Sequence, residues 1–135
     1  MTDDRTPPPQ VWPTLRATDA RALIRFLVDA FGLREIAVYG DGDVVEHAQL
    51  AWPEGGGIML GSVRDDGSPW QLRPGGFGCY VVCSAPDALY RRATAAGATI
   101  IQEMNETDYG SRGFAARDPE GNLWSFGTYR GEPVA

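Results

Sequence analysis

The sequence predicts an α+β fold in which one small unit occurs twice. The ten residues PEGGGIMLGS at 53–62 return sixty-six positions later as PEGNLWSFGT at 119–128, with Pro, Glu, Gly and a later Gly in register. Each copy follows the same order: an extended segment, an amphipathic helix, and three strand-like segments of which the last follows a Pro-Glu-Gly turn. Because the two units are equivalent, we expect the functional site to lie between them.

The first unit begins with an extended segment and continues with a helix over 19–31. The apolar residues of this helix share one stripe on a 3.6-residue period: Ala22, Leu23, Phe26, Leu27, Ala30 and Phe31. Thr18 or Asp19 can cap its first turn, and Gly32 provides a C-terminal stop. The predicted extended segments of this unit are 11–18, 34–40, 44–52 and 57–62.

The second unit repeats this order with a helix over 86–96. Ser84 and Asp87 resemble the two partners of a capping box at the start of this helix, and Gly97 ends it. The predicted extended segments are 76–83, 99–104, 113–118 and 122–129. The chain therefore divides into module one at 11–62, a linker at 63–76 and module two at 77–130.

The linker contains two prolines and three glycines and shows no apolar periodicity. It can fold back within one chain or carry module two across to a partner subunit, and the sequence leaves both possibilities open. Residues 1–10, MTDDRTPPPQ, lack the apolar segment of an export signal, so we expect a flexible N-terminal arm on a cytoplasmic protein. Residues 131–135 are expected to form a short tail.

Composition places the chain among globular proteins of one domain. It has 135 residues, of which 43% are hydrophobic and 22% charged, and no apolar run is long enough to span a membrane. The net charge of -6 opposes binding to nucleic acid and to anionic membranes. This acidity is explained by solubility or by attraction of a cationic ligand, and both explanations can hold together.

The two cysteines lie four residues apart in a predicted strand. At the usual rise per residue Cys79 and Cys83 stand about 13 Å apart, which is too far for a disulfide. No histidine lies near them in the sequence to activate either thiol. We therefore expect two buried, unreacted thiols.

Four short motifs point to a family when they occur in this order. They are AFGL at 30–33, AAGA at 95–98, YGSR at 109–112 and DPEGNLWSFG at 118–127. Together with the duplicated unit they make residues 11–130 similar to the vicinal oxygen chelate superfamily, which includes glyoxalase I, the bleomycin resistance proteins and extradiol dioxygenases. The resemblance implies one domain of two βαβββ modules whose curved sheets surround an open cleft. It also implies pairing of modules within a chain or, as we expect here, across a homodimer.

In the metal-using members of this superfamily, four side chains from the first and last strand of each module hold a divalent metal. Matching the motifs residue by residue puts these positions at Trp12, Met59, Gly78 and Ser125. A shift of one residue brings Pro13 or Phe77 instead, which bind metals no better. The resemblance therefore predicts a site without metal, and we expect no cofactor.

The single histidine, His47, follows Glu46 in a predicted strand. Adjacent strand residues face opposite sides of a sheet, so at most one of the two enters the cleft. If His47 faces inward, it is a hydrogen-bonding or proton-transfer group; if it faces outward, it is a surface or interface residue. A lone histidine without carboxylate partners makes a poor metal site.

Aromatic and polarizable side chains replace the metal ligands, and such residues suit an aromatic or apolar ligand. The predicted ligand-binding residues are Trp12, His47, Met59, Trp70, Tyr109, Arg112, Trp124 and Ser125. Each has a plainer explanation. The tryptophans and Met59 can be core residues, Trp70 can form a dimer contact, and the loop of Tyr109 can be a turn in which Arg112 pairs with a carboxylate.

The leading hypothesis is a metal-independent binding protein of the bleomycin-resistance type. It would sequester a bulky aromatic or cationic metabolite or antibiotic in the cleft between modules. The alternative is a glyoxalase-like lyase or isomerase, possibly metal-dependent, with His47 and either Glu46 or Glu103 as acid or base. A third hypothesis is a scaffold that uses the fold only for subunit contacts. A small-molecule ligand is the expected partner in the first two cases.

Overall fold

The computed structural model describes residues 8–134 and confirms the duplicated order of elements. Module one contains β1 (Thr14–Ala17), α1 (Ala20–Phe31), β2 (Arg34–Asp41), β3 (Val44–Ala51) and β4 (Gly57–Ser62). Module two contains β5 (Gly78–Val82), α2 (Pro86–Ala95), β6 (Thr99–Glu106), β7 (Arg112–Arg117) and β8 (Leu123–Gly127). Most of the expected N-terminal arm, residues 1–7, lies outside the described residues.

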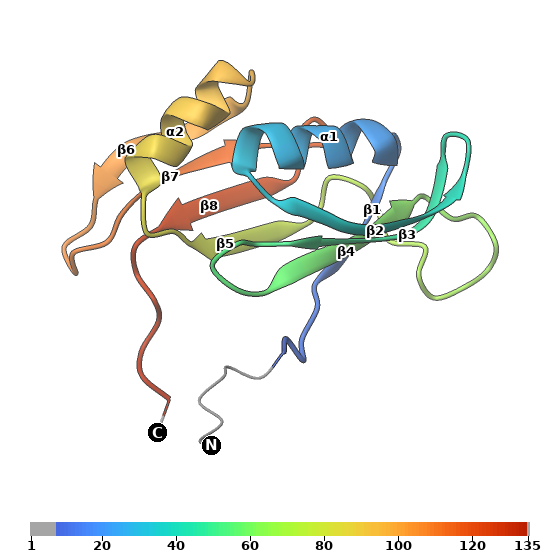
Figure 1. The fold of residues 1–135 in the computed structure, drawn as a ribbon, viewed down its shortest axis with the longest axis horizontal. Coiled ribbons are helices and arrows are strands. Elements are labelled where there is room, and N and C mark those ends of the chain that lie inside the picture. The colour runs from blue at the N-terminus through green and yellow to red at the C-terminus, as the bar shows by residue number, and fades with distance from the viewer. Residues whose placement is uncertain (1–7, 135) are drawn as a thin grey trace.

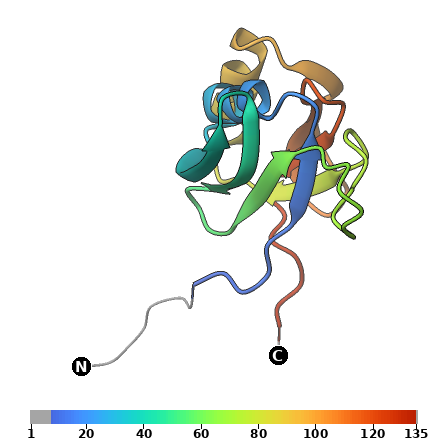
Figure 2. The ribbon, with the colours of Figure 1, turned by 90° about the vertical axis from the view of Figure 1, so that its right-hand side faces the viewer.

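Each module forms its own four-stranded sheet with the same topology. The strand orders are β1-β4-β3-β2 and β5-β8-β7-β6, and in each sheet the first strand runs parallel to the last. Both helices cover the same side of the two sheets, so the other face of each sheet stays open (Figures 1 and 2). The two sheets do not close into a barrel, which agrees with the predicted α+β fold.

The ends of α1 follow the local signals in the sequence. Asp19, rather than Thr18, is the N-cap, and its carboxylate accepts a hydrogen bond of 3.1 Å from the Ala22 amide. Gly32 ends the helix in the left-handed conformation, with φ of 76°. The predicted boundaries of this helix are therefore correct to within one residue.

The predicted cap of α2 is wrong. Ala85 occupies the N-cap position and no side chain caps the helix. The Asp87 carboxylate instead accepts two hydrogen bonds from Arg112, at 2.7 and 3.0 Å. The Ser84 amide donates to Glu54 of module one. Long-range partners have thus replaced both contacts of the expected capping box.

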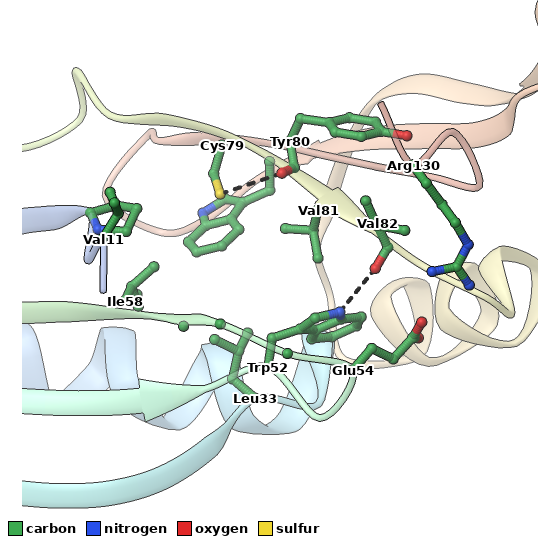
Figure 3. A pocket seen from close by; sticks show the side chains of 15 residues that line it. Val11, Leu33, Trp52, Glu54, Ile58, Cys79, Tyr80, Val81, Val82 and Arg130 are labelled. Atoms are coloured by element: carbon green, nitrogen blue, oxygen red, sulfur yellow. Dashed lines mark hydrogen bonds between the residues drawn. The ribbon is translucent and has the colours of Figure 1, made fainter. Parts of the chain in front are cut away.

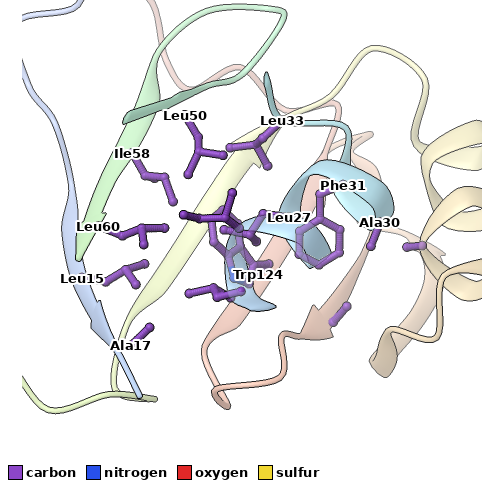
Figure 4. Close-up of a cluster of buried hydrophobic side chains, with 14 of the residues drawn as sticks. Leu15, Ala17, Leu27, Ala30, Phe31, Leu33, Leu50, Ile58, Leu60 and Trp124 are labelled. Carbon is purple, nitrogen blue, oxygen red and sulfur yellow. The ribbon is translucent and has the colours of Figure 1, made fainter. Parts of the chain in front are cut away.

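The core runs without a break from one module to the other. Phe31 of α1 is fully buried, with its ring centroid 4.7 Å from that of Phe126 and 5.6 Å from that of Trp124, both in β8. Leu27 lies beside Phe31 on the same side of the helix (Figure 4). The C-terminal end of α1 therefore packs onto the sheet of module two.

The repeated Pro-Glu-Gly turns join the modules reciprocally. The Glu120 carboxylate accepts hydrogen bonds from the amides of Thr18 and Asp19, at 2.7 and 2.9 Å, at the start of α1. The Glu54 carboxylate accepts from the Ser84 amide at 3.1 Å, just before α2. Glu54 and Glu120 are sixty-six residues apart, as are Thr18 and Ser84. The glutamate of each turn thus binds the helix start of the other module.

Two further contacts join the modules within one chain. Arg92 of α2 donates to the Asp29 and Val28 carbonyls at 2.8 and 3.0 Å, which satisfies the C-terminal end of α1. The indole nitrogen of Trp52 donates to the Val82 carbonyl at 2.9 Å. Within the described chain the linker therefore folds back and lets the two modules pack together. No helix among residues 8–134 is long and apolar enough to cross a membrane.

Candidate functional site

The open face of module one carries a pocket. In β1 and β4 the residues Leu15 and Leu60 are buried on the helix side, so the alternating Thr14 and Met59, which pair directly across the strands, point to the open face. Here a cavity of about 350 Å³ is lined by Thr14, Arg16, His47, Met59, Leu60, Arg64 and Trp70. We call this cavity the open-face pocket.

Two guanidinium groups give the open-face pocket its charge. Arg16 is only 7% exposed, and its Nε donates to the Trp70 carbonyl at 3.0 Å. A side chain at Gly61 would collide with the Arg16 guanidinium, so this glycine makes room for it. Burial lowers the pKa of Arg16, and the neighbouring Arg64 lowers it further. The pocket therefore presents positive charge to a ligand, although the chain as a whole is acidic.

Arg64 is partly engaged by protein groups. It donates to the Glu46 carbonyl at 3.2 Å and lies 3.5 Å from an Asp66 carboxylate oxygen. Hydrogen bonds from Ser68 and from Arg64 hold the pKa of the Asp66 carboxyl below its usual range. Since Arg64 and its carboxylate are both partly exposed, this ion pair can exchange for a ligand group at little cost.

His47 lies on the open face, where it lines the pocket. Its ring stacks on that of Tyr39, with centroids 6.4 Å apart and planes inclined by 14°. Among residues 8–134 no carboxylate forms an ion pair with it. Glu103 belongs to β6 of module two and accepts a hydrogen bond from Tyr90. Among residues 8–134 His47 therefore has no ion-paired carboxylate, and Glu103 is engaged in module two.

Two of the predicted tryptophans also lie on the open face of module one. Trp70 belongs to the linker, is 53% exposed, and is held over the face through the bond from Arg16 to its carbonyl. Trp12 precedes β1, and a Cβ atom added at Gly57 would come within 2.9 Å of its ring. The structure therefore brings Trp12, His47, Met59 and Trp70 to one face.

The remaining predicted residues belong to module two and lie apart from this group. Ser125 pairs with Tyr80 on the open face of the second sheet. Tyr109 is 69% exposed and packs edge-on against Tyr129, with centroids 5.2 Å apart. Trp124 is 1% exposed, and its indole nitrogen donates to Asp118 within the core.

Arg112 already has carboxylate partners. Besides Asp87 it contacts Glu106 at 3.5 Å, and the hydrogen bond to Asp87 is the main cause that raises the pKa of Arg112. This arrangement matches the plainer explanation of the YGSR loop as a turn with a paired arginine.

The positions of the family's metal ligands do not fit a metal. Trp12, Met59, Gly78 and Ser125 offer an indole, a thioether, no side chain and a neutral hydroxyl, whereas divalent cations bind imidazole, thiolate or carboxylate. In the described part of the chain no group of three His, Cys, Asp or Glu residues is arranged to hold a metal ion. No chemical step through a metal can be assigned to these residues.

A second and larger cavity lies between the two modules, where the sequence predicts a site, but of the predicted ligand-binding residues only Trp124 belongs to its lining. It measures about 470 Å³ and is lined by residues that include Trp52, Cys79, Val81 and Arg130 (Figure 3). A signal was present in Trp52, a tryptophan beside the Pro-Glu-Gly turn, but its partners come from module two. We call this cavity the seam pocket.

Two βαβββ modules with open sheet faces are the architecture that the family resemblance implies. The family model of the Glyoxalase/Bleomycin resistance protein/Dioxygenase superfamily matches residues 10–126, and the chain belongs to this superfamily. Among solved structures, TioX from Micromonospora sp. ML1 shares 30% identity with a TM-score of 0.68, covering 87% of this chain and 97% of TioX.

Other solved structures share the fold at lower identity. UcmS2 has 19% identity and a TM-score of 0.69, with 87% of this chain and 95% of UcmS2 covered. A glyoxalase/bleomycin resistance protein from Streptomyces sp. CB03234 has 22% identity and a TM-score of 0.64, with 84% and 94% covered. No curated protein matches the chain.

Proposed function

We propose that this protein is a metal-independent binding protein of the bleomycin-resistance type, which sequesters a bulky aromatic small molecule in the open-face pocket. The observation that carries the proposal is the combination of Met59 and Trp70 with two guanidinium groups in one cavity. Thioether and indole surfaces suit an aromatic body. Arg16 and Arg64 suit an anionic or hydrogen-bond-accepting substituent. The pocket therefore supports the aromatic part of the sequence-based hypothesis and disfavours a cationic ligand.

The proposal includes a homodimer that covers the bound ligand. Several large apolar side chains on or beside the open faces are exposed: Tyr39, Trp70, Leu72, Tyr80 and Leu123, at 62, 53, 39, 47 and 40%. Side chains of this kind gathered on one side of a monomer are typical of an interface. In the dimer the open face of module one would meet that of module two of the partner. Sedimentation should show a dimer that Tyr80→Glu converts to a monomer, and a wild-type monomer at high concentration would refute this part.

Ligand binding is tested by calorimetry with 9-anthracenecarboxylate as the probe. Met59→Glu places a carboxylate in the pocket and should weaken binding by at least tenfold, and Arg64→Gln should weaken it several-fold. Ile101→Glu makes the same kind of change at a half-exposed position on β6 and should leave binding unchanged. Equal affinity of the wild type and the Met59→Glu variant would overturn the assignment of this pocket.

The alternative function, a glyoxalase-like lyase or isomerase, depends on His47. This residue lies in the pocket and its ring stacks on that of Tyr39, but no carboxylate among residues 8–134 forms an ion pair with it. Elemental analysis of the purified protein, followed by assays with hemithioacetal substrates, separates the two functions. A stoichiometric metal, or turnover that His47→Ala abolishes, would favour the enzyme over the binding protein.

A further inference from the structure

The seam pocket is separate from the open-face pocket. It lies where the turn before β4 and the edge of β5 come together, and the two cavities have no lining residue in common. Figure 3 shows Trp52 and Ile58 on the module-one side and Cys79 and Val81 on the module-two side. Its volume of about 470 Å³ is in the range of small-molecule sites.

The walls of the seam pocket are apolar and held in place. The indole nitrogen of Trp52 is satisfied by the Val82 carbonyl and that of Trp124 by the Asp118 carboxylate, both at 2.9 Å. The Trp52 indole, which is partly exposed, therefore has no polar group left to pair and presents carbon surface to the cavity, whereas Trp124 is 1% exposed and lies beneath the wall. Since the Trp52 ring is fixed by a protein contact, a ligand would not have to order it on binding.

Two charged side chains, Glu54 and Arg130, lie at the rim of the seam pocket, and they differ in whether another protein group binds them. The Glu54 carboxylate is engaged by the Ser84 amide. Arg130 lies in the C-terminal segment after β8 and has no hydrogen bond or ion pair to any residue in the range 8–134. Its guanidinium lies on the same side of the cavity as Glu54 (Figure 3). The group available to a ligand at this rim is thus a guanidinium, which prefers a carboxylate.

We propose that the seam pocket is a second ligand site, specific for a planar aromatic carboxylate whose ring system lies against Trp52 and Val81 and whose carboxylate pairs with Arg130. The site is complete within one chain, so it does not depend on a dimer. It is also independent of the proposed function of the open-face pocket, and either assignment can fail without the other.

The experiment titrates the full-length Met59→Glu variant, in which the open-face pocket is blocked, with 2-naphthoate and with the neutral 2-naphthalenemethanol, following tryptophan fluorescence and calorimetry. This variant should bind the acid about tenfold more tightly than the alcohol, and adding Arg130→Gln should remove this preference. Adding Val81→Phe fills the seam pocket and should weaken both ligands at least tenfold. Adding Arg73→Gln is the matched charge control and should leave both affinities unchanged.

A second measurement maps the site without altering its walls. Cys79 lines the seam pocket, so bound 2-naphthoate should slow its alkylation by iodoacetamide in a Cys83→Ala background. Burial raises the pKa of the Cys79 thiol, and the reaction is therefore run near pH 9. Protection of Cys79 supports the site even if Val81→Phe fails to fold. Binding without protection of Cys79, equal affinity for acid and alcohol, or no binding of 2-naphthoate to the Met59→Glu variant would overturn it.

Discussion

The substitution Glu120→Ala should destabilise the protein, because it removes one of the two reciprocal glutamate contacts between the modules. Glu120 is half-buried and accepts two amide hydrogen bonds at 2.7 and 2.9 Å from the start of α1. A hydrogen bond to a charged group contributes about 1.5–3 kcal/mol when buried. Water can reach the freed amides, because Thr18 and Asp19 are exposed, so the loss is smaller than two full bonds. We expect the free energy of unfolding to fall by about 2 kcal/mol.

Urea denaturation at pH 7 measures this change, with the midpoint falling and the m value unchanged because the same surface is exposed on unfolding. The melting temperature should fall by roughly 6–8 °C for a chain of this size. Glu54→Ala should cost about half as much, since its two oxygens serve one amide and the residue is exposed. Glu35→Ala, an exposed change on β2, is the control and should stay within about 0.5 kcal/mol of wild type. If Glu120→Ala lowers the unfolding free energy no more than Glu35→Ala does, the reciprocal glutamate contacts do not stabilise the packing of the two modules.

Three further predictions concern charged and reactive groups. The hydrogen bond from Arg112 lowers the pKa of Asp87, so this pair stabilises the fold above about pH 4. The contribution is lost as the pH falls through the folded-state pKa of Asp87. The difference in unfolding free energy between wild type and Arg112→Gln should therefore disappear as the pH is lowered from 5 to about 2, and a difference independent of pH would contradict this. Asp118 is buried and accepts four hydrogen bonds. The substitution Asp118→Asn should therefore lower the unfolding free energy, measured by urea denaturation, by about 2–4 kcal/mol. An unchanged unfolding free energy would show that the four donors find other partners. Burial raises the pKa of both Cys79 and Cys83, so at pH 7 both thiols should react with Ellman's reagent much more slowly than in the urea-unfolded chain, and equal rates would contradict their burial.

Much of the fold could be predicted because its signals are local. The apolar stripe of α1 and its stop at Gly32 depend on residues within a few turns, and the structure reproduces them to within one residue. The β4 strand follows its Pro-Glu-Gly turn and spans the predicted range. The prediction failed at the cap of α2 because Asp87 has a partner that is distant in the sequence. Its carboxylate accepts two hydrogen bonds from the Arg112 guanidinium, and such charged pairs are stronger than a bond from a backbone amide at the helix start.

The candidate site could be predicted only in part. Reading the repeat in register identified Met59 and Trp12 as residues that replace metal ligands, and the structure places both on the open face. The positive charge of the open-face pocket could not be predicted from the register of the repeat. Arg16 lies inside an apparent strand, and its place on the open face follows only from tertiary contacts: its bond to the Trp70 carbonyl and the room that Gly61 leaves for its guanidinium.

The sequence by itself determined the duplicated topology, the limits of the helices and the absence of metal ligands at the family's positions, since each follows from residues close together or in register. The tertiary structure alone decided that His47 lines a pocket, that Trp124 is core, and which residues line the seam pocket between the modules. Trp52, Val81 and Arg130 line this pocket together, although they lie far apart in the sequence. No local period encodes such contacts, because they arise only when the two modules pack together and bury one common core.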